Sequence, residues 1–186
     1  MRAMSSMADH GIVPNVLSYL PKGVLQVNYS SGVSANKGNI LTPTLVQDRP
    51  NIIYSDADPN ALYTLLLTDP DAPSRNNPEW AEWHHWLKVN IPGNDLSKGD
   101  EVYQYIGSGP PKDSGLHRYI FLLFPQAGQA KVEDSERRTN TSADNRGNQK
   151  TSNIVEKYSL KDAVAVNIYQ AEYDSYVDKL YKQIGF

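Results

Sequence analysis

Most apolar segments of the chain have the patterns of β-strands, and only one has the period of a helix. Residues 62–67 (LYTLLL) and 116–124 (LHRYIFLLF) are apolar on both faces, which predicts central strands of a sheet. Residues 83–91 (WHHWLKVNI) predict a third long strand. Shorter strands are expected at 24–29, 51–54, 102–106 and 164–169. Residues 40–44 contain Pro43, which favours an edge or irregular segment.

The predicted helix lies near the end of the chain, between 171 and 184. Its apolar positions recur three, four, seven and eleven residues after the first, at Tyr173, Tyr176, Val177, Leu180 and Ile184. Tyr181 lies at the margin of this stripe. The pattern as a whole predicts a mainly β protein with one clear helix. We expect residues 1–10 to be a flexible extension and residues 11–186 to form a single domain.

Alternation along residues 83–91 divides the side chains of that strand between two faces. One set is Trp83, His85, Leu87, Val89 and Ile91, and the other is His84, Trp86, Lys88 and Asn90. The first set is apolar apart from His85, so we expect it to face the core. His85 is then a buried polar group that needs a partner. Asp69 and Asp71, which follow the strand at 62–67, are candidates, and a backbone carbonyl is the alternative.

A second histidine begins another strand. His117 shares a face with Tyr119, Phe121 and Leu123, opposite Arg118. The preceding loop, Gly107-Ser108-Gly109-Pro110-Pro111, is glycine-rich and presents backbone amides. Two core-facing histidines, two aspartates and a set of amides are therefore expected near one end of the sheet.

Composition narrows the possible classes of protein. The chain has 18 Lys and Arg against 21 Asp and Glu, and it lacks the basic stripe or basic amphipathic helix of proteins that bind nucleic acid or anionic membranes. The count of cysteines is 0, which excludes disulfides, thiolate nucleophiles and cysteine-ligated metals. No apolar run approaches a membrane span, and the first residues do not read as a secretory signal. We expect a cytoplasmic monomer without a cofactor.

Three chemistries fit the expected constellation. The first is an anion pocket, in which glycine-loop amides and one or two charged histidines hold a phosphate group. The aspartates would orient the imidazoles and raise their pKa values. The second is a metal site of two His and two Asp in a hydrolase or oxygenase. The third is a serine hydrolase using Ser108, but Gly107-Ser108-Gly109 is not a Gly-x-Ser-x-Gly elbow. The anion pocket is favoured, and a plain tight turn is the structural alternative for the loop.

The segment from 133 to 153 is polar, with Asp144-Asn145-Arg146-Gly147-Asn148 in its middle. Its composition predicts a long surface excursion that buries little.

Two long motifs resemble the signatures of the phosphatidylethanolamine-binding proteins, the family of the Raf kinase inhibitor protein. The first is Asp69-Pro70-Asp71-Ala72-Pro73-Ser74-Arg75 with Trp83-His84-His85-Trp86. The second is Gly107-Ser108-Gly109-Pro110-Pro111 with Gly115-Leu116-His117-Arg118-Tyr119. The segment from Tyr169 to Tyr181 is similar too, and the resemblance extends from about residue 11 to 181.

The resemblance implies a large central antiparallel or mixed sheet packed on a smaller sheet, with short helices and one C-terminal α-helix. It implies a non-catalytic protein with a small pocket for phosphate or a phosphoethanolamine or phospholipid head group. A kinase or protease partner is a further expectation, through inhibition by surface loops. Carried over by position, the residues expected at the pocket are Asp69, Asp71, Trp80, His85, Gly107, Gly109, Pro110, His117, Tyr119 and Tyr181.

The sequence departs from the family pattern in three places. Trp80 stands where animal relatives typically carry a tyrosine at the pocket edge. Arg146-Gly147-Asn148-Gln149 lacks the phenylalanine that usually follows. Asn153 occupies the position of a regulatory serine. The first departure bears on the pocket mouth, and the third on kinase regulation.

Overall fold

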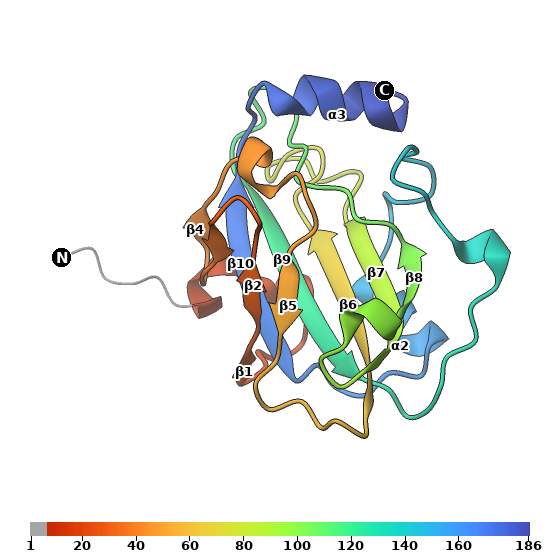
Figure 1. The fold of residues 1–186 in the computed structure, drawn as a ribbon. Coiled ribbons are helices and arrows are strands. Elements are labelled where there is room, and N and C mark those ends of the chain that lie inside the picture. Colours follow the sequence, from red (N-terminus) through yellow and green to blue (C-terminus); the bar gives the residue numbers. More distant parts are fainter. Residues whose placement is uncertain (1–6) are drawn as a thin grey trace.

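A mixed seven-stranded sheet organises the molecule, which is represented here by a computed structural model that describes residues 7–186 (Figure 1). The central strands β10 (Ala165–Ala171), β9 (His117–Pro125), β6 (Leu62–Asp69) and β7 (Trp83–Pro92) pair antiparallel in that order. Three short strands complete the sheet: β8 (Asp100–Tyr103) pairs antiparallel with β7, while β1 (Gly23–Val24) and β4 (Asn39–Ile40) pair parallel with β10. The three long strands predicted from apolar runs are thus confirmed, whereas the strand predicted at 102–106 ends at Tyr103 and the one predicted at 24–29 is divided between β1 and a strand of the smaller sheet.

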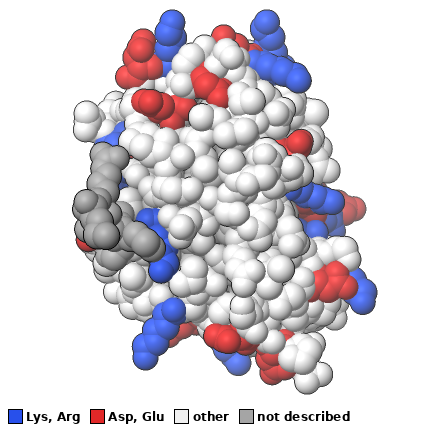
Figure 2. All heavy atoms as spheres, turned by 60° about the vertical axis from the view of Figure 1, so that its left-hand side comes forward, with Lys and Arg blue, Asp and Glu red and all other residues white. Residues whose placement is uncertain are grey.

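A smaller antiparallel sheet of three strands covers one face of the large sheet. Its order is β3 (Ser34–Ala35), β2 (Gln26–Asn28) and β5 (Asn51–Ile53). The stretch 23–47, which contains β2 and β3, carries one charged residue, Lys37. Figure 2 shows that Lys, Arg, Asp and Glu are sparse in the middle of the face turned forward there and gather at its margins.

The helices are short. The α-helices are α1 (Ile12–Asn15), α2 (Thr151–Lys157) and α3 (Tyr176–Ile184), and the 3₁₀ helices are η1 (Met7–His10), η2 (Pro43–Val46), η3 (Leu96–Lys98) and η4 (Asp134–Glu136). The helix predicted from 171 is confirmed only from Tyr176 onward, because β10 continues to Ala171 and pairs with β9. Within residues 7–186, no helix has the length and apolar composition needed to cross a bilayer.

Apolar side chains fill both faces of the large sheet. Leu65, Leu67 and Phe121 pack with Val27 and Ile52 of the smaller sheet. The opposite face has its own core beneath α2 and the N-terminal segment, formed among others by Leu66, Ile120, Leu122, Ile12 and Ile154. Alternation along β9 therefore holds as predicted, and the strand is buried on both sides because two layers cover it.

Alternation along β7 is interrupted, which corrects the predicted division of its side chains. Leu67 pairs with Trp86 but Thr68 pairs with His84, so His85 is an extra residue in the ladder. Such a bulge changes which face the following residues occupy. Trp86 consequently packs in the core between the sheets, on the face expected for His85.

The shift persists until a second irregularity restores the original alternation. Leu87 and Val89 pack in the opposite core, whereas Ile91 returns to the core between the sheets. The second irregularity includes Asn90, whose φ of 58° lies in the left-handed region that Asn tolerates. Leu87 and Val89 thus do not share the face of Trp83 and His85, contrary to the prediction.

Two further expectations about loops are revised. Residues 1–6 of the expected extension lie outside the described residues, but Met7 is 8% exposed and begins η1. The polar segment 133–153 buries more than its composition predicts. Arg146 and Thr151 are 0% and 1% exposed because this segment folds back against the start of β7.

Candidate functional site

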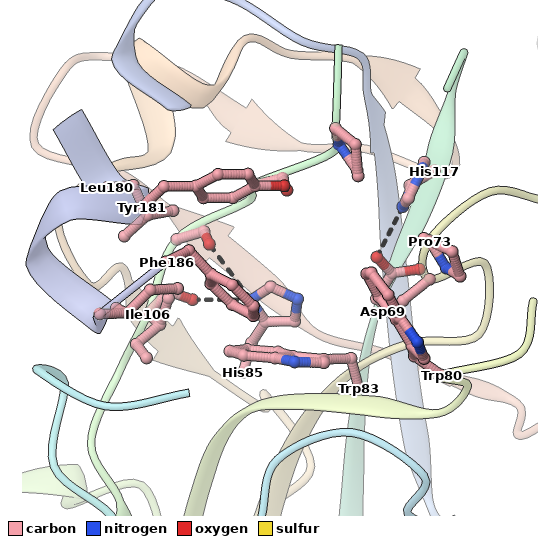
Figure 3. Close-up of a pocket in the computed structure, with 15 residues that line it drawn as sticks. Asp69, Pro73, Trp80, Trp83, His85, Ile106, His117, Leu180, Tyr181 and Phe186 are labelled. Atoms are coloured by element: carbon pink, nitrogen blue, oxygen red, sulfur yellow. Dashed lines mark hydrogen bonds and ion pairs between the residues drawn. The ribbon is translucent and has the colours of Figure 1, made fainter. Parts of the chain in front are cut away.

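A pocket of about 200 Å³ opens at the end of the large sheet next to α3 (Figure 3). Its walls come from the loop after β6, the start of β7, the loop after β8, the start of β9 and the end of α3. Seven of the residues expected at the site line it: Asp69, Trp80, His85, Gly107, Gly109, His117 and Tyr181. Asp71, Pro110 and Tyr119 lie outside this lining.

His117 and Asp69 form a buried pair at one side of the pocket. Nδ1 of His117 lies 2.8 Å from Oδ2 of Asp69, and both residues are at most 3% exposed. Burial raises the pKa of Asp69, although the hydrogen bond from His117 opposes that rise. Oδ1 of Asp69 also accepts the backbone N–H of Asp71 at 2.7 Å, which fixes the turn after β6.

A serine extends this pair into a chain of three groups. Nε2 of His117 lies 3.0 Å from Oγ of Ser114, so Ser114, His117 and Asp69 stand in the order of a hydrolase triad. The Ser114 hydroxyl, however, donates to the carbonyl of Pro111 at 2.7 Å, and Ser114 lies outside the pocket lining. The arrangement therefore orients the imidazole and does not present a nucleophile to the pocket.

Ser108, the serine considered from sequence, is placed differently. It is 0% exposed, and its hydroxyl has no hydrogen-bond partner among the described residues. No base is therefore in contact with it, and the hydrolase hypothesis that used Ser108 lacks its geometry.

His85 is held by backbone carbonyls, the alternative that the sequence left open. Its Nδ1 lies 3.0 Å from the carbonyl of Ile106 and 3.1 Å from that of Gly107. Because carbonyls only accept, Nδ1 carries the proton, and Nε2 is left as an acceptor facing the pocket (Figure 3). Burial lowers the pKa of His85 to about 3. The expectation that a carboxylate raises this pKa is wrong for His85, which is neutral at pH 7.

Asp71 serves a different contact from Asp69. Its carboxylate accepts two hydrogen bonds from the Arg118 guanidinium, at 2.7 and 2.9 Å, and one from the Arg118 backbone N–H at 2.9 Å. Burial alone would raise the pKa of Asp71, but these bonds lower it. Asp71 faces a separate polar groove, which also borders Arg75, Glu82 and Lys150. Asp69 and Asp71 are two positions apart in the sequence, yet Asp69 lines the pocket and Asp71 lines the separate polar groove.

Two tyrosines lie next to His85 and the glycine loop, Tyr181 in the pocket lining and Tyr119 behind it. The Tyr181 hydroxyl donates to the carbonyl of Gly109 at 2.9 Å, and burial raises its pKa to about 12. The Tyr119 ring packs edge-on against His85 at 5.2 Å, and its buried hydroxyl has no partner among the described residues. An added Cβ at Gly109 would lie 2.9 Å from a Leu180 methyl, so a larger residue there would displace that side chain.

The pocket mouth is apolar and aromatic. Trp80 and Phe186 are 44% and 70% exposed, and the pocket also borders Leu180 and Ile184 of α3. Sequence reasoning missed these last three residues as site residues. The apolar stripe of the predicted helix contained Leu180 and Ile184, but which surface that stripe covers depends on tertiary packing. Phe186 carried no signal beyond its aromatic ring.

A metal centre would need clustered ligands. Across residues 7–186, no group of three or more His, Asp or Glu side chains is arranged so that it could hold a metal ion. Asp71 is turned away from His85 and His117, so the set of two His and two Asp that the metal hypothesis required is not brought together.

The sequence of most of this domain matches a known protein family. The family model described as phosphatidylethanolamine-binding protein matches residues 21–170. The chain belongs to the phosphatidylethanolamine-binding protein family. The match covers the strands of the large sheet up to residue 170 in β10 and the loops that line the pocket, but not α3.

The chain is also similar to individual relatives and solved structures. "Putative odorant-binding protein A5" of Drosophila melanogaster is 35% identical over 178 residues, covering 96% of this chain and 84% of the relative. The solution structure of CG7054 is 43% identical with a TM-score of 0.74, covering 94% of this chain and 98% of that one. A carboxypeptidase Y inhibitor, solved with its cognate proteinase, is 27% identical with a TM-score of 0.76, covering 90% and 93%.

Proposed function

We propose that this protein is a non-catalytic binding protein whose pocket takes a small phosphate-bearing head group such as phosphoethanolamine. The observation that carries the proposal is the convergence of His85, His117 and Asp69 at one end of an otherwise apolar pocket. Polar groups confined to one end suit a ligand with a polar head and leave the walls for apolar contact.

The protonation states favour a phosphate group that still carries a proton. Neutral His85 offers an acceptor at Nε2, to which a phosphate O–H donates. The His117–Asp69 pair supplies a second polar contact. A fully ionised phosphate would lack the proton for Nε2 and would meet the Asp69 carboxylate. The second pKa of a phosphate monoester is about 6, so the favoured monoanion dominates below that pH.

Two observations support a non-catalytic role. The hydroxyl of Ser114 is committed to a backbone carbonyl, and Ser108 has no base in contact. A fluorophosphonate probe, which labels activated serines, is expected to leave the protein unlabelled. Labelling at Ser114 or Ser108 would replace this proposal with a hydrolase.

Calorimetric titration with inorganic phosphate and with phosphoethanolamine at pH 5.5 tests the proposal directly. We expect one site for each ligand, and competition between them. Absence of binding by both ligands would overturn it. A crystal grown with phosphate should place the anion between Nε2 of His85 and the His117–Asp69 pair.

Inhibition of a protease is a second candidate, favoured by the likeness to the carboxypeptidase Y inhibitor. Surface loops around the pocket would contact the protease. The same loops would contact a kinase if the protein acts in a signalling cascade. Capture of carboxypeptidase Y by the immobilised protein, with and without phosphoethanolamine, separates the two candidates. Equal capture of carboxypeptidase Y with and without phosphoethanolamine favours the protease inhibitor. Absence of capture under both conditions favours the head-group-binding protein. A cytoplasmic location stays a prediction, which fractionation tests.

A further inference from the structure

A buried arginine lies behind the wall of the pocket. Arg146 is 0% exposed and forms no ion pair with any carboxylate of the described part of the chain. Arginine is almost never fully buried unless it is paired. Burial lowers the pKa of Arg146 to about 10, which leaves the guanidinium charged at pH 7. The fold therefore keeps a positive charge inside the molecule with no carboxylate in direct contact, although the negative charge of Glu101 favours the charged form of Arg146.

Backbone carbonyls hold this guanidinium in place. One terminal nitrogen donates to the carbonyls of His84 and His85, both at 3.2 Å. The other donates to Gln104 at 2.8 Å, to Thr139 at 2.9 Å and to Arg138 at 3.4 Å. The first two carbonyls belong to the bulge of β7, where the ladder is irregular. Carbonyl dipoles stabilise the charge but do not neutralise it.

The charge stands next to residues that line the pocket. The Arg146 Cζ atom lies 5.6 Å from the centre of the Trp83 ring, and that ring lies 4.3 Å from the His85 ring. Both rings face the pocket. Gly147 allows this approach, because a Cβ there would lie 3.2 Å from the Trp83 ring. The Arg146-Gly147 dipeptide thus brings a cation to the back of the pocket wall.

We propose that Arg146 is a specificity-determining residue whose buried charge makes the pocket select anions. The inference rests on the proposed head-group function and assigns the missing counter-ion to the ligand. A charge in the interior is screened far less by salt than a surface charge, so its field reaches the pocket. Arg146 acts through this field, across Trp83 and His85, without touching the ligand.

The remaining ionisable groups around the pocket add no unpaired charge to it. His117 and Asp69 form a closed pair, and the Tyr119 and Tyr181 hydroxyls are neutral at pH 7 because burial raises their pKa values. The positive charge of Arg146 also adds to burial in lowering the pKa of His85. Burial is thus the main cause of a neutral His85, and the buried charge of Arg146 adds to this effect while favouring an anionic ligand.

Three variants separate the charge from a merely structural role. Arg146→Met removes the charge, and Arg146→Lys keeps it while losing the planar fork. Arg137→Met removes an equal charge from an exposed position on the same segment and controls for net charge. Each variant is checked by circular dichroism and then titrated with inorganic phosphate at pH 5.5. The His85 imidazole is titrated by NMR without ligand.

We expect Arg146→Met to bind phosphate about tenfold more weakly, from the loss of one unit charge in a medium of intermediate dielectric. Arg146→Lys and Arg137→Met should stay within about threefold of the unchanged protein, since both keep a buried cation. The titration midpoint of His85, expected near pH 3, should rise by about one unit in Arg146→Met and little in Arg146→Lys.

Equal phosphate affinity in folded Arg146→Met overturns the inference, as does equal loss in Arg146→Lys and Arg146→Met. If Arg146→Met does not fold, Arg146→Lys decides: retained affinity supports the charge, and lost affinity in a folded protein overturns it. If the unchanged protein binds no phosphate, the proposed function fails. The His85 titration then decides separately whether the field of Arg146 reaches the pocket.

Discussion

Nδ1 of His117 and Oδ2 of Asp69 lie 2.8 Å apart, at the first residue of β9 and the last residue of β6. The ladder between these strands ends at Thr68 and Ile120, one residue before Asp69 and three residues after His117. The hydrogen bond between the two side chains therefore continues the contact between the strands past the last backbone pair. It closes the sheet at the point where the pocket begins.

Phosphate affinity should fall as the pH rises from 5 to 8. Over this range the phosphate monoanion loses the proton that Nε2 of His85 accepts, and His85 cannot replace it because its pKa is about 3. Calorimetry at four pH values measures the profile. Sulfate is the matched control: it carries no proton in this range, so we expect it to bind weakly throughout. A flat phosphate profile, or equal binding of sulfate, would contradict the role assigned to His85.

Replacing His85 by alanine should weaken phosphate binding by about 1–3 kcal/mol, the cost of losing a hydrogen bond to a charged ligand. His10→Ala is the control, since His10 borders the separate polar groove. Titration calorimetry at pH 5.5 provides the measurement. Unchanged affinity in His85→Ala, with normal affinity in the control, would remove His85 from the site.

Arg118→Met should lower the free energy of unfolding by about 3–5 kcal/mol, because it leaves the buried Asp71 carboxylate without its main partner. Arg75 contacts the same carboxylate at 3.3 Å but is half-exposed, so Arg75→Met should cost about 0–1 kcal/mol. Urea denaturation of the two variants gives the comparison. Equal costs would mean that burial does not set the strength of this pair.

The Asp71–Arg118 pair should also make the free energy of unfolding decrease at acid pH. Arg118 holds the pKa of Asp71 below its ordinary value, so the stabilisation is complete above that ordinary value. It is lost as the pH falls through the lowered pKa. Asp71→Asn should therefore be less stable at neutral pH and lose less stability between pH 5 and 2. Parallel profiles for the two proteins would assign the acid sensitivity to other carboxylates.

Trp80→Ala should weaken binding of a short-chain phosphatidylethanolamine by about 1–2 kcal/mol, the value of apolar area lost from a partly exposed ring. Free phosphoethanolamine lacks the chains that would contact the rim of the pocket, so its affinity should change little. Leu45→Ala is a control at another exposed apolar side chain. Fluorescence titration distinguishes the two ligands, and an equal loss for both would place Trp80 at the head group instead.

Particular residues show how far sequence reasoning reached. Alternation along 116–124 placed His117 and Tyr119 on one face, and the strand has no bulge that changes it. The same rule failed for Leu87 and Val89, because backbone irregularities leave no clear mark in the side-chain pattern. Asp69 and Asp71 share a motif, yet Arg118 draws one carboxylate away from the histidines.

The order of apolar and polar residues was enough to identify the long strands of the large sheet, the helix over most of its length and the two histidines that line the pocket. These features follow from local sequence, since each segment carries its own apolar run or its own period. Contacts between distant segments decided the rest. The neutrality of His85, the separation of Asp69 from Asp71, the aromatic mouth and the buried charge of Arg146 all depend on which carbonyl, cation or ring folding brings near. Burial then sets the electrostatic free energy of each group, and no residue carries that quantity in its own side chain.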